Sequence, residues 1–162
     1  MVKRLSADAR KMVLTSATEE ASRRGDRRLG TDNLLLGLLN DADSPAAKAL
    51  GVSLAAARAA SDALDLAALA AVGVEVAAMG EPPQATPARR LPPLTSGARA
   101  VVKRAINEAR PFKSGHIETR HFLLALLPLK RPDPAAELLH ALGVDPATVR
   151  ERLARSDRGE VA

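Results

Sequence analysis

The chain has 162 residues, which suits one compact domain, and it carries a formal net charge of +5 with a pI near 10.2. It contains no Cys, so disulfides and thiolate metal sites are excluded. Apolar residues make up 46% of the chain but aromatic residues only 1%, and much of the apolar share is Ala. This composition predicts close-packed helices rather than a sheet.

The basic charge is concentrated in residues 89–131, where ten Lys and Arg face two Glu, so this section carries +8 and the remainder −3. A solvated surface is the favoured interpretation, and a nucleic-acid or other anion-binding face is the alternative. No run of sequence approaches the roughly 18 apolar residues of a membrane span, and the charged start lacks an apolar signal segment. We therefore expect a monomeric cytoplasmic protein without membrane contact.

In chain order, Ser6 is expected to cap a first helix that Gly25 ends after about Arg24. A leucine-rich helix follows over residues 31–39, with Thr31 as its cap. Short third and fourth helices are predicted after Ser44 and Ser53, and an extra helical segment over residues 65–71 is expected to pack on this first unit.

The second half of the chain repeats this order of helix-capping residues. Thr95 is expected to cap a helix to about Arg110, and Thr119 to cap a second leucine-rich helix. Asp133 and Asp145, each followed by Pro, open the third and fourth helices. The predicted organisation is a first repeat over residues 1–79, a Pro-rich linker over 80–93, a second repeat over 94–155, and a disordered tail over 156–162.

An internal duplication organises these elements. Residues 30–39 recur as residues 118–127 at an offset of 88, and Leu-Gly-Val at 50–52 recurs at 142–144 after a four-residue insertion. Neither small repeat is expected to bury its leucine helix alone. The sequence therefore predicts an all-α fold of two pseudo-symmetric four-helix repeats that pack together as one domain.

The sequence predicts no nucleotide-binding, metal-binding or acid/base catalytic site. The stretch 25–31 lacks the Lys of a phosphate-binding loop, and no strand precedes it. His116, Glu118 and His121 lack the i, i+4 spacing of a helical zinc motif, so His121 is expected to hydrogen-bond near the helix start. Glu19 and Glu20 do not share a helix face and are read as solvated charge, Glu20 near the core edge. We expect no enzyme activity, cofactor or metal.

The doubled pattern resembles the Clp N-terminal domain, the substrate-receiving domain of Clp-type protein-unfolding ATPases. The matching stretches, in both copies, are Leu-Ser or Leu-Thr, then Ala-Arg, then Glu-Ala, the leucine helix, and Leu-Gly-Val. The resemblance covers nearly the whole chain. It implies two packed four-helix repeats that bind peptides, adaptor proteins or modified substrates rather than perform chemistry.

The resemblance also implies where ligands bind. A phosphoarginine-binding position in each repeat matches Thr31 with Asp32 and Thr119 with Arg120, where Asp32 keeps the family's acidic character and Arg120 reverses it. A surface for adaptors and cyclic peptide natural products matches six positions: Leu5, Arg10, Val13, Leu94, Arg99 and Val102.

No Walker motif is present, so we expect a free-standing recognition module that modulates or buffers Clp-dependent proteolysis, with a Clp ATPase as a further partner. The alternative is a basic helical nucleic-acid-binding protein that uses residues along one helix: Arg99, Lys103, Arg104 and Arg110, with Asn107 among them.

Overall fold

Helices dominate the computed structural model of the protein, which describes residues 4–74, 91–112 and 115–159. The first repeat contains α1 (Ala7–Lys11), a π-helical turn (Met12–Ser16), α2 (Ala17–Arg24), α3 (Thr31–Leu39), α4 (Pro45–Leu50) and α5 (Leu54–Ala71). The second contains α6 (Ser96–Glu108), α7 (Thr119–Leu126), α8 (Pro134–Ala141) and α9 (Pro146–Asp157). Because α1, the π turn and α2 form one continuous helix, the predicted all-α fold of two four-helix repeats is confirmed.

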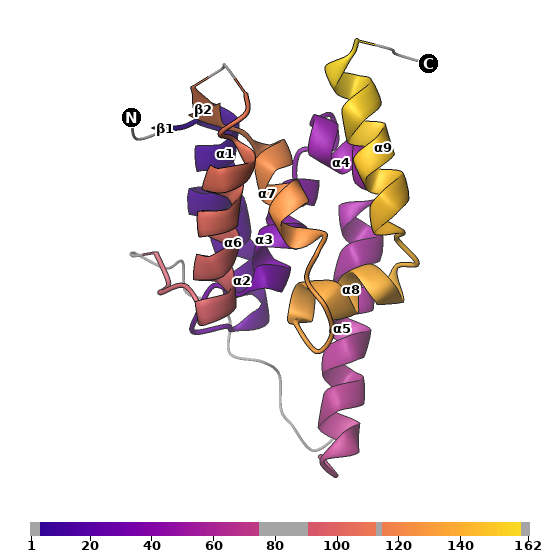
Figure 1. The fold of residues 1–162 in the computed structure, drawn as a ribbon. Coiled ribbons are helices and arrows are strands. Elements are labelled where there is room, and N and C mark those ends of the chain that lie inside the picture. Colours follow the sequence, from indigo (N-terminus) through magenta and orange to yellow (C-terminus); the bar gives the residue numbers. More distant parts are fainter. Residues whose placement is uncertain (1–3, 75–90, 113–114, 160–162) are drawn as a thin grey trace.

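The two leucine-rich helices, α3 and α7, lie at the centre. In Figure 1, α1, α2 and α6 lie on one side of them and α4, α5, α8 and α9 on the other. The repeats interlock, because α3 and α5 pack on α8 while α4 packs on α7 and α9. The core is therefore shared, and its largest fully buried apolar side chains come mainly from the two leucine helices: Leu34, Leu35, Leu36, Phe122, Leu123 and Leu126. Burying each such side chain contributes about 1.5–3 kcal/mol.

The heads of the two repeats are held in the same way. Strand β1 (Arg4–Leu5) pairs in parallel with β2 (His116–Ile117), and the Ser6 amide donates to the Ile117 carbonyl at 2.9 Å. At the equivalent place Leu94 forms a parallel bridge with Leu29, and the amide of the following Thr donates to the Leu29 carbonyl at 3.0 Å. Each repeat thus starts by pairing with the segment that precedes a leucine helix.

The π turn accounts for a difference in helix length between the repeats. Buried Met12 and Ala17 are five residues apart, whereas their counterparts Val101 and Ala105 in α6 are four apart. One extra residue is therefore absorbed as a π turn, which leaves both flanking faces directed at the core. The start of α2 packs closely against α3, because a Cβ built on Gly37 would lie 2.9 Å from the Ala17 amide nitrogen.

The observed helix N-caps agree with the predicted ones except at the two leucine helices. Ser6, Ser44, Ser53, Thr95, Asp133 and Asp145 cap their helices as expected. Thr31 and Thr119, however, are the first helical residues rather than the caps. The preceding amides instead donate to a side chain of the first turn, Gly30 to Asn33 Oδ1 at 2.7 Å and Glu118 to His121 Nδ1 at 2.8 Å. The expected hydrogen-bonding role of His121 near the helix start is confirmed.

The segment predicted as an extra helix is also different. Residues 65–71 are the second half of α5, which runs unbroken because its Ala-rich sequence offers no helix-breaking residue before Gly73. This helix packs on α8 of the second repeat as well as on α3. At the other end, α9 continues through Ser156 and Asp157, the first residues of the expected tail. The linker predicted over 80–93 lies outside the described residues up to 90, and the domain boundaries stay a prediction.

Glu20 is buried rather than solvated. Its side chain is 1% exposed and accepts hydrogen bonds from Arg58 of α5 and from Arg23, the latter at 3.2 Å. Burial alone would raise the pKa of Glu20, but these hydrogen bonds and charges outweigh it and hold that pKa below its ordinary value. Arg58 reaches this carboxylate because the chain folds back and brings α5 close to Glu20. Helical spacing within α2 could not predict this contact.

Candidate functional site

A pocket of about 400 Å³ lies at the start of the first leucine helix, and we call it the first-repeat pocket. It is formed where α2 ends, α3 begins, α5 passes and α8 of the other repeat begins. Its lining combines apolar side chains with charged ones: Arg24, Asp32, Ser61, Leu64, Asp65, Ala68, Pro132, Pro134, Glu137 and Leu138. The predicted site residue Asp32 is therefore part of a formed pocket.

One internal arginine dominates the electrostatics of this pocket. Arg24 donates to Asp32 and, at 2.8 and 2.9 Å, to the two carboxylate oxygens of Asp65, while Asp26 lies 3.6 Å away. Burial alone would lower the pKa of Arg24, but the hydrogen bond and charge of Asp32, with the other two carboxylates, raise it above its ordinary value. Three carboxylates thus hold one guanidinium at the mouth of an otherwise largely apolar pocket.

A second pocket, of about 490 Å³, lies at the start of the second leucine helix, and we call it the second-repeat pocket. It is lined by residues of both repeats: Ser6, Asp8, Pro45, Glu118, Thr119, Arg120, Leu153, Ser156 and Asp157. Here Arg120 pairs with Asp157 of α9 and, at 3.0 Å, with Glu118. Its guanidinium also stacks over Phe112, 4.5 Å from the ring centroid.

The two pockets are related by the pseudo-two-fold axis of the repeats. Asp32 and Arg120 occupy equivalent positions at the offset of 88, and Asp65 and Asp157 are equivalent at the offset of 92 that follows the insertion. Both pockets hold a guanidinium against the carboxylate of the fourth helix. In the first that guanidinium comes from Arg24, and in the second from the leucine helix itself.

The two threonines at these helix starts differ in their surroundings. Thr31 is buried, donates to Asp133 Oδ1 at 2.8 Å and accepts from the Ala135 amide at 3.2 Å, so its hydroxyl helps to cap α8 of the other repeat. Thr119 is half-buried and lines the second-repeat pocket. Of the two threonines, Thr119 lines the second-repeat pocket, whereas Thr31 does not line the first-repeat pocket.

The six predicted adaptor-surface positions form two equivalent sets at the repeat heads. Leu5 and Leu94 are half-buried beside their β-bridges. Val13 and Val102 are also half-buried and pack against the core, while Arg10 and Arg99 are exposed one helical turn before them. In each repeat an exposed Arg and a half-exposed Val thus share one helix face.

Sequence reasoning missed several charged residues of the pockets, among them the ion-pair partners Arg24, Asp65 and Asp157. A signal for two of them was available, because the offset of 92 that aligns the closing Leu-Gly-Val elements also aligns Asp65 with Asp157. The third could not be found from spacing. Arg24 reaches Asp32 only because the turn at Gly25 brings the end of α2 back to the start of α3.

Within residues 4–74, 91–112 and 115–159, no group of three or more His, Cys, Asp or Glu is arranged to hold a metal ion. In the same part of the chain, no helix is both long enough and apolar enough to cross a membrane.

Comparisons with known proteins agree with this architecture. Residues 93–158 match the family described as the Clp repeat (R) N-terminal domain. Over 158 residues, 96% of its length, the chain is 31% identical to chloroplastic chaperone proteins, ClpC2 of Oryza sativa subsp. japonica and ClpC1 of Arabidopsis thaliana. It spans about 15% of the length of these relatives.

Among solved structures, the fold is similar to the N-terminal domain of the caseinolytic protease associated chaperone ClpD from Arabidopsis thaliana, with a TM-score of 0.70 and 17% identity. The match covers 98% of this chain and 97% of that one, so both repeats and their mutual packing are shared. The doubled sequence pattern, the family match and the common fold together place this chain in the Clp N-terminal domain family.

Proposed function

We propose that the chain is a non-enzymatic recognition module that receives substrate peptides or adaptor proteins in Clp-dependent proteolysis. The observation that carries the proposal is the pair of pseudo-equivalent pockets, each of which already holds a guanidinium against carboxylates at the start of a leucine helix. The first of these pockets suits a ligand that carries an arginine-like group on an extended peptide, because carboxylates hold a guanidinium by charge-assisted hydrogen bonds.

The first-repeat pocket is the proposed phosphoarginine site. An incoming guanidinium would replace that of Arg24 at Asp32, and the released Arg24 would pair with the phosphoryl group. Leu64, Pro134 and Leu138 offer apolar surface to the methylene groups of the ligand.

The second-repeat pocket is not expected to take a guanidinium in the same way. Arg120 occupies the position that Asp32 has in the first repeat, and it already pairs with the carboxylates of Glu118 and Asp157. Phosphoarginine recognition is therefore one-sided in this proposal. Thr119 remains available to hydrogen-bond a peptide that crosses the pocket.

Adaptor proteins and cyclic peptide natural products are proposed to dock at the repeat heads, on Leu5, Arg10 and Val13 and on the equivalent set of Leu94, Arg99 and Val102. Support comes from their partial exposure and from the exposed arginines beside half-buried valines. By binding such partners, a monomeric module would buffer or modulate the supply of substrates to a Clp ATPase. The comparisons do not favour the nucleic-acid alternative, and the cytoplasmic location stays a prediction.

Calorimetric titration with a peptide that contains phosphoarginine, and with the same peptide carrying arginine, tests the proposal. Asp32→Asn should weaken phosphoarginine binding about tenfold, the loss expected for one charge-assisted hydrogen bond. Asp62→Asn is the matched control, because Asp62 lies on α5 but contacts Arg23 outside the pocket. Equal binding by wild type and the Asp32 variant, or no binding of either peptide, would contradict the proposal.

A further inference from the structure

A third, smaller cavity of about 170 Å³ lies on the π-turn side of the first helix, between that turn, the end of α3 and the starts of α4 and α7. Its floor is buried and contains Met12, Ser16 and Leu38, with exposed fractions of 3, 3 and 2%. Its rim is charged and exposed, and the ten lining residues are Asp8, Lys11, Met12, Ser16, Gly37, Leu38, Asn40, Asp41, Ser44 and Thr119. We call it the π-turn cavity.

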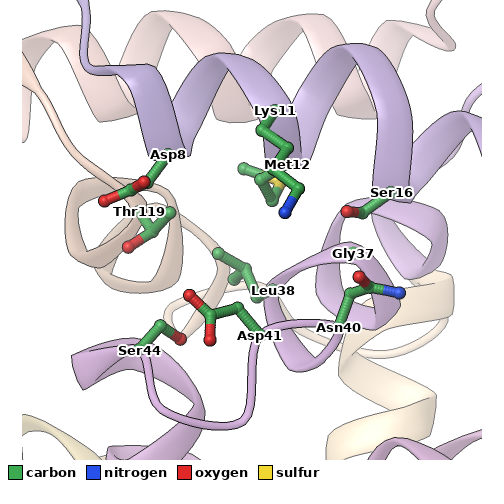
Figure 2. A pocket seen from close by; sticks show the side chains of 10 residues that line it. All are labelled: Asp8, Lys11, Met12, Ser16, Gly37, Leu38, Asn40, Asp41, Ser44 and Thr119. Carbon is green, nitrogen blue, oxygen red and sulfur yellow. The ribbon is translucent and has the colours of Figure 1, made fainter.

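The charges of the rim are separated into two poles. Figure 2 shows the carboxylates of Asp8 and Asp41 on the side of Thr119, while the Lys11 nitrogen is directed into the cavity toward the side of Ser16 and Asn40. No ion pair joins Lys11 to either carboxylate among the described residues. The cavity thus offers an acidic pole and a basic pole with open space between them.

The hydroxyl of Ser16 faces this space. Ser16 is 3% exposed as a residue and lines the cavity, and Figure 2 shows its side-chain oxygen on the cavity side. A hydroxyl in such a place can donate a hydrogen bond to a ligand and accept one from it. Ser16 therefore marks the floor of the cavity as a place where a polar group is expected to bind.

The second repeat does not reproduce the cavity. At the offset of 89, Asp8 and Lys11 correspond to Gly97 and Ala100, and Ser16 falls within the extra π-turn register that α6 lacks. Gly97 packs closely against the first repeat, since a Cβ there would lie 3.3 Å from Thr31 Cγ2. A repeat of this fold therefore packs without these polar groups, which indicates that they serve something other than packing.

We propose that the π-turn cavity binds a small free α-amino acid in its zwitterionic form. The ligand's ammonium group would be held by Asp8 and Asp41, and its carboxylate by Lys11, the Ser16 hydroxyl and the Asn40 amide. A short aliphatic side chain would lie against Met12 and Leu38. The volume of about 170 Å³ is suited to a ligand of the size of alanine or serine.

Both ligand charges are needed by this arrangement. A simple cation at the acidic pole would leave Lys11 and the Ser16 hydroxyl without a contact to the ligand, and a simple anion would lie opposite two carboxylates. A zwitterion satisfies both poles at once and restores charge balance along the cavity. The proposal is independent of the phosphoarginine site, because none of its charged rim residues lines the first-repeat pocket, although Asp8 and Thr119 also line the second-repeat pocket.

The test is a titration of ¹⁵N-labelled protein followed by two-dimensional NMR, with L-alanine as the probe. Two matched probes each lack one charge: L-alaninamide has no carboxylate, and N-acetyl-L-alanine has no ammonium group. L-alanine should shift the amide signals of residues 8–16 and 37–44 and bind about tenfold more tightly than either matched probe, as expected for the loss of one charge-assisted contact.

Variants locate the site. Lys11→Met and Asp41→Asn should each weaken L-alanine binding about tenfold, whereas Lys48→Met, an exposed lysine on α4, should leave it unchanged. Equal binding of L-alanine and L-alaninamide would overturn the proposal in favour of a cation site, and equal binding of N-acetyl-L-alanine in favour of an anion site. Absence of shifts in the wild-type protein overturns it without any variant.

Discussion

The close approach of α3 to Ala17, the first residue of α2 after the π turn, makes a specific prediction for Gly37→Ala. The new methyl group would lie 2.9, 3.0 and 3.1 Å from the amide nitrogen, Cβ and Cα of Ala17. Two of these atoms are backbone, so they cannot move aside as a flexible side chain could. Overpacking of this kind costs about 1–3 kcal/mol, and the upper part of the range applies to a rigid backbone contact.

The gain in helix propensity offsets part of that cost. Replacing Gly by Ala in a helix is worth about 1 kcal/mol, so the net loss of unfolding free energy for Gly37→Ala is about 2 kcal/mol. For a domain of this length, that corresponds to a fall in Tm of about 4–8 °C. Thermal unfolding followed by far-UV circular dichroism measures it, since the chain has no Trp or Tyr for fluorescence.

Gly97→Ala is the matched control, also within a helix. Its new methyl group would meet only side-chain atoms, Thr31 Cγ2 at 3.3 Å and Asp133 Oδ2 at 3.4 Å, so its unfolding free energy should stay within about 1 kcal/mol of wild type. If Gly37→Ala proves as stable as the wild-type protein, the contact between α3 and Ala17 is not rigid and the reasoning fails.

Three further predictions concern buried polar groups. Because the folded-state pKa of Glu20 is lowered, its stabilising effect is present above pH 4.5 and disappears as the pH falls through that folded-state pKa; Glu20→Gln should flatten this acid dependence in urea unfolding at a series of pH values. Arg58→Ala leaves the buried carboxylate with Arg23 alone and should lower the unfolding free energy by about 1–3 kcal/mol, measured by urea denaturation; a change below a few tenths would show that the pair is unimportant. Thr31→Val removes the hydroxyl that bonds α8 and should cost about 1 kcal/mol by the same measurement, whereas Thr119→Val should cost less; equal losses would contradict the asymmetry.

The overall fold could be predicted because its determinants are local and occur twice. Ser44 before Pro45, and Asp133 before Pro134, each open a helix with a side-chain cap and a proline that needs no amide donor. The run of leucines that precedes each of these starts can only be stable in a core. These features depend on neighbours within four residues, so one sequence is enough to read them.

The site was only partly predictable, because it depends on contacts between distant elements. The resemblance to the Clp N-terminal domain implied Asp32, but the carboxylate of Asp65 reaches the same guanidinium from 41 residues beyond Arg24. Glu20 was read as solvated because nothing in α2 reveals that α5 would cover it with Arg58. Helical spacing identifies the face of a residue, whereas the partner of that face is set by tertiary packing.

Thr31 was predicted to cap its own helix, and it caps another helix instead. The local pattern of a hydroxyl before a leucine run fits both outcomes, and the choice is made by Asp133, which lies 102 residues later and accepts from the Thr31 hydroxyl. The amide of Gly30 donates to the side chain of Asn33 instead. Local signals therefore placed the helix start within one residue but could not assign its hydrogen bonds.

The pairing of β1 with β2 affects how the protein can be made. Leu5 is synthesised 112 positions before its partner Ile117. At a synthesis rate of about 5–20 residues per second, the first strand waits roughly 6–22 s for the second. Until then the head of the first repeat lacks the strand with which it pairs in the folded protein.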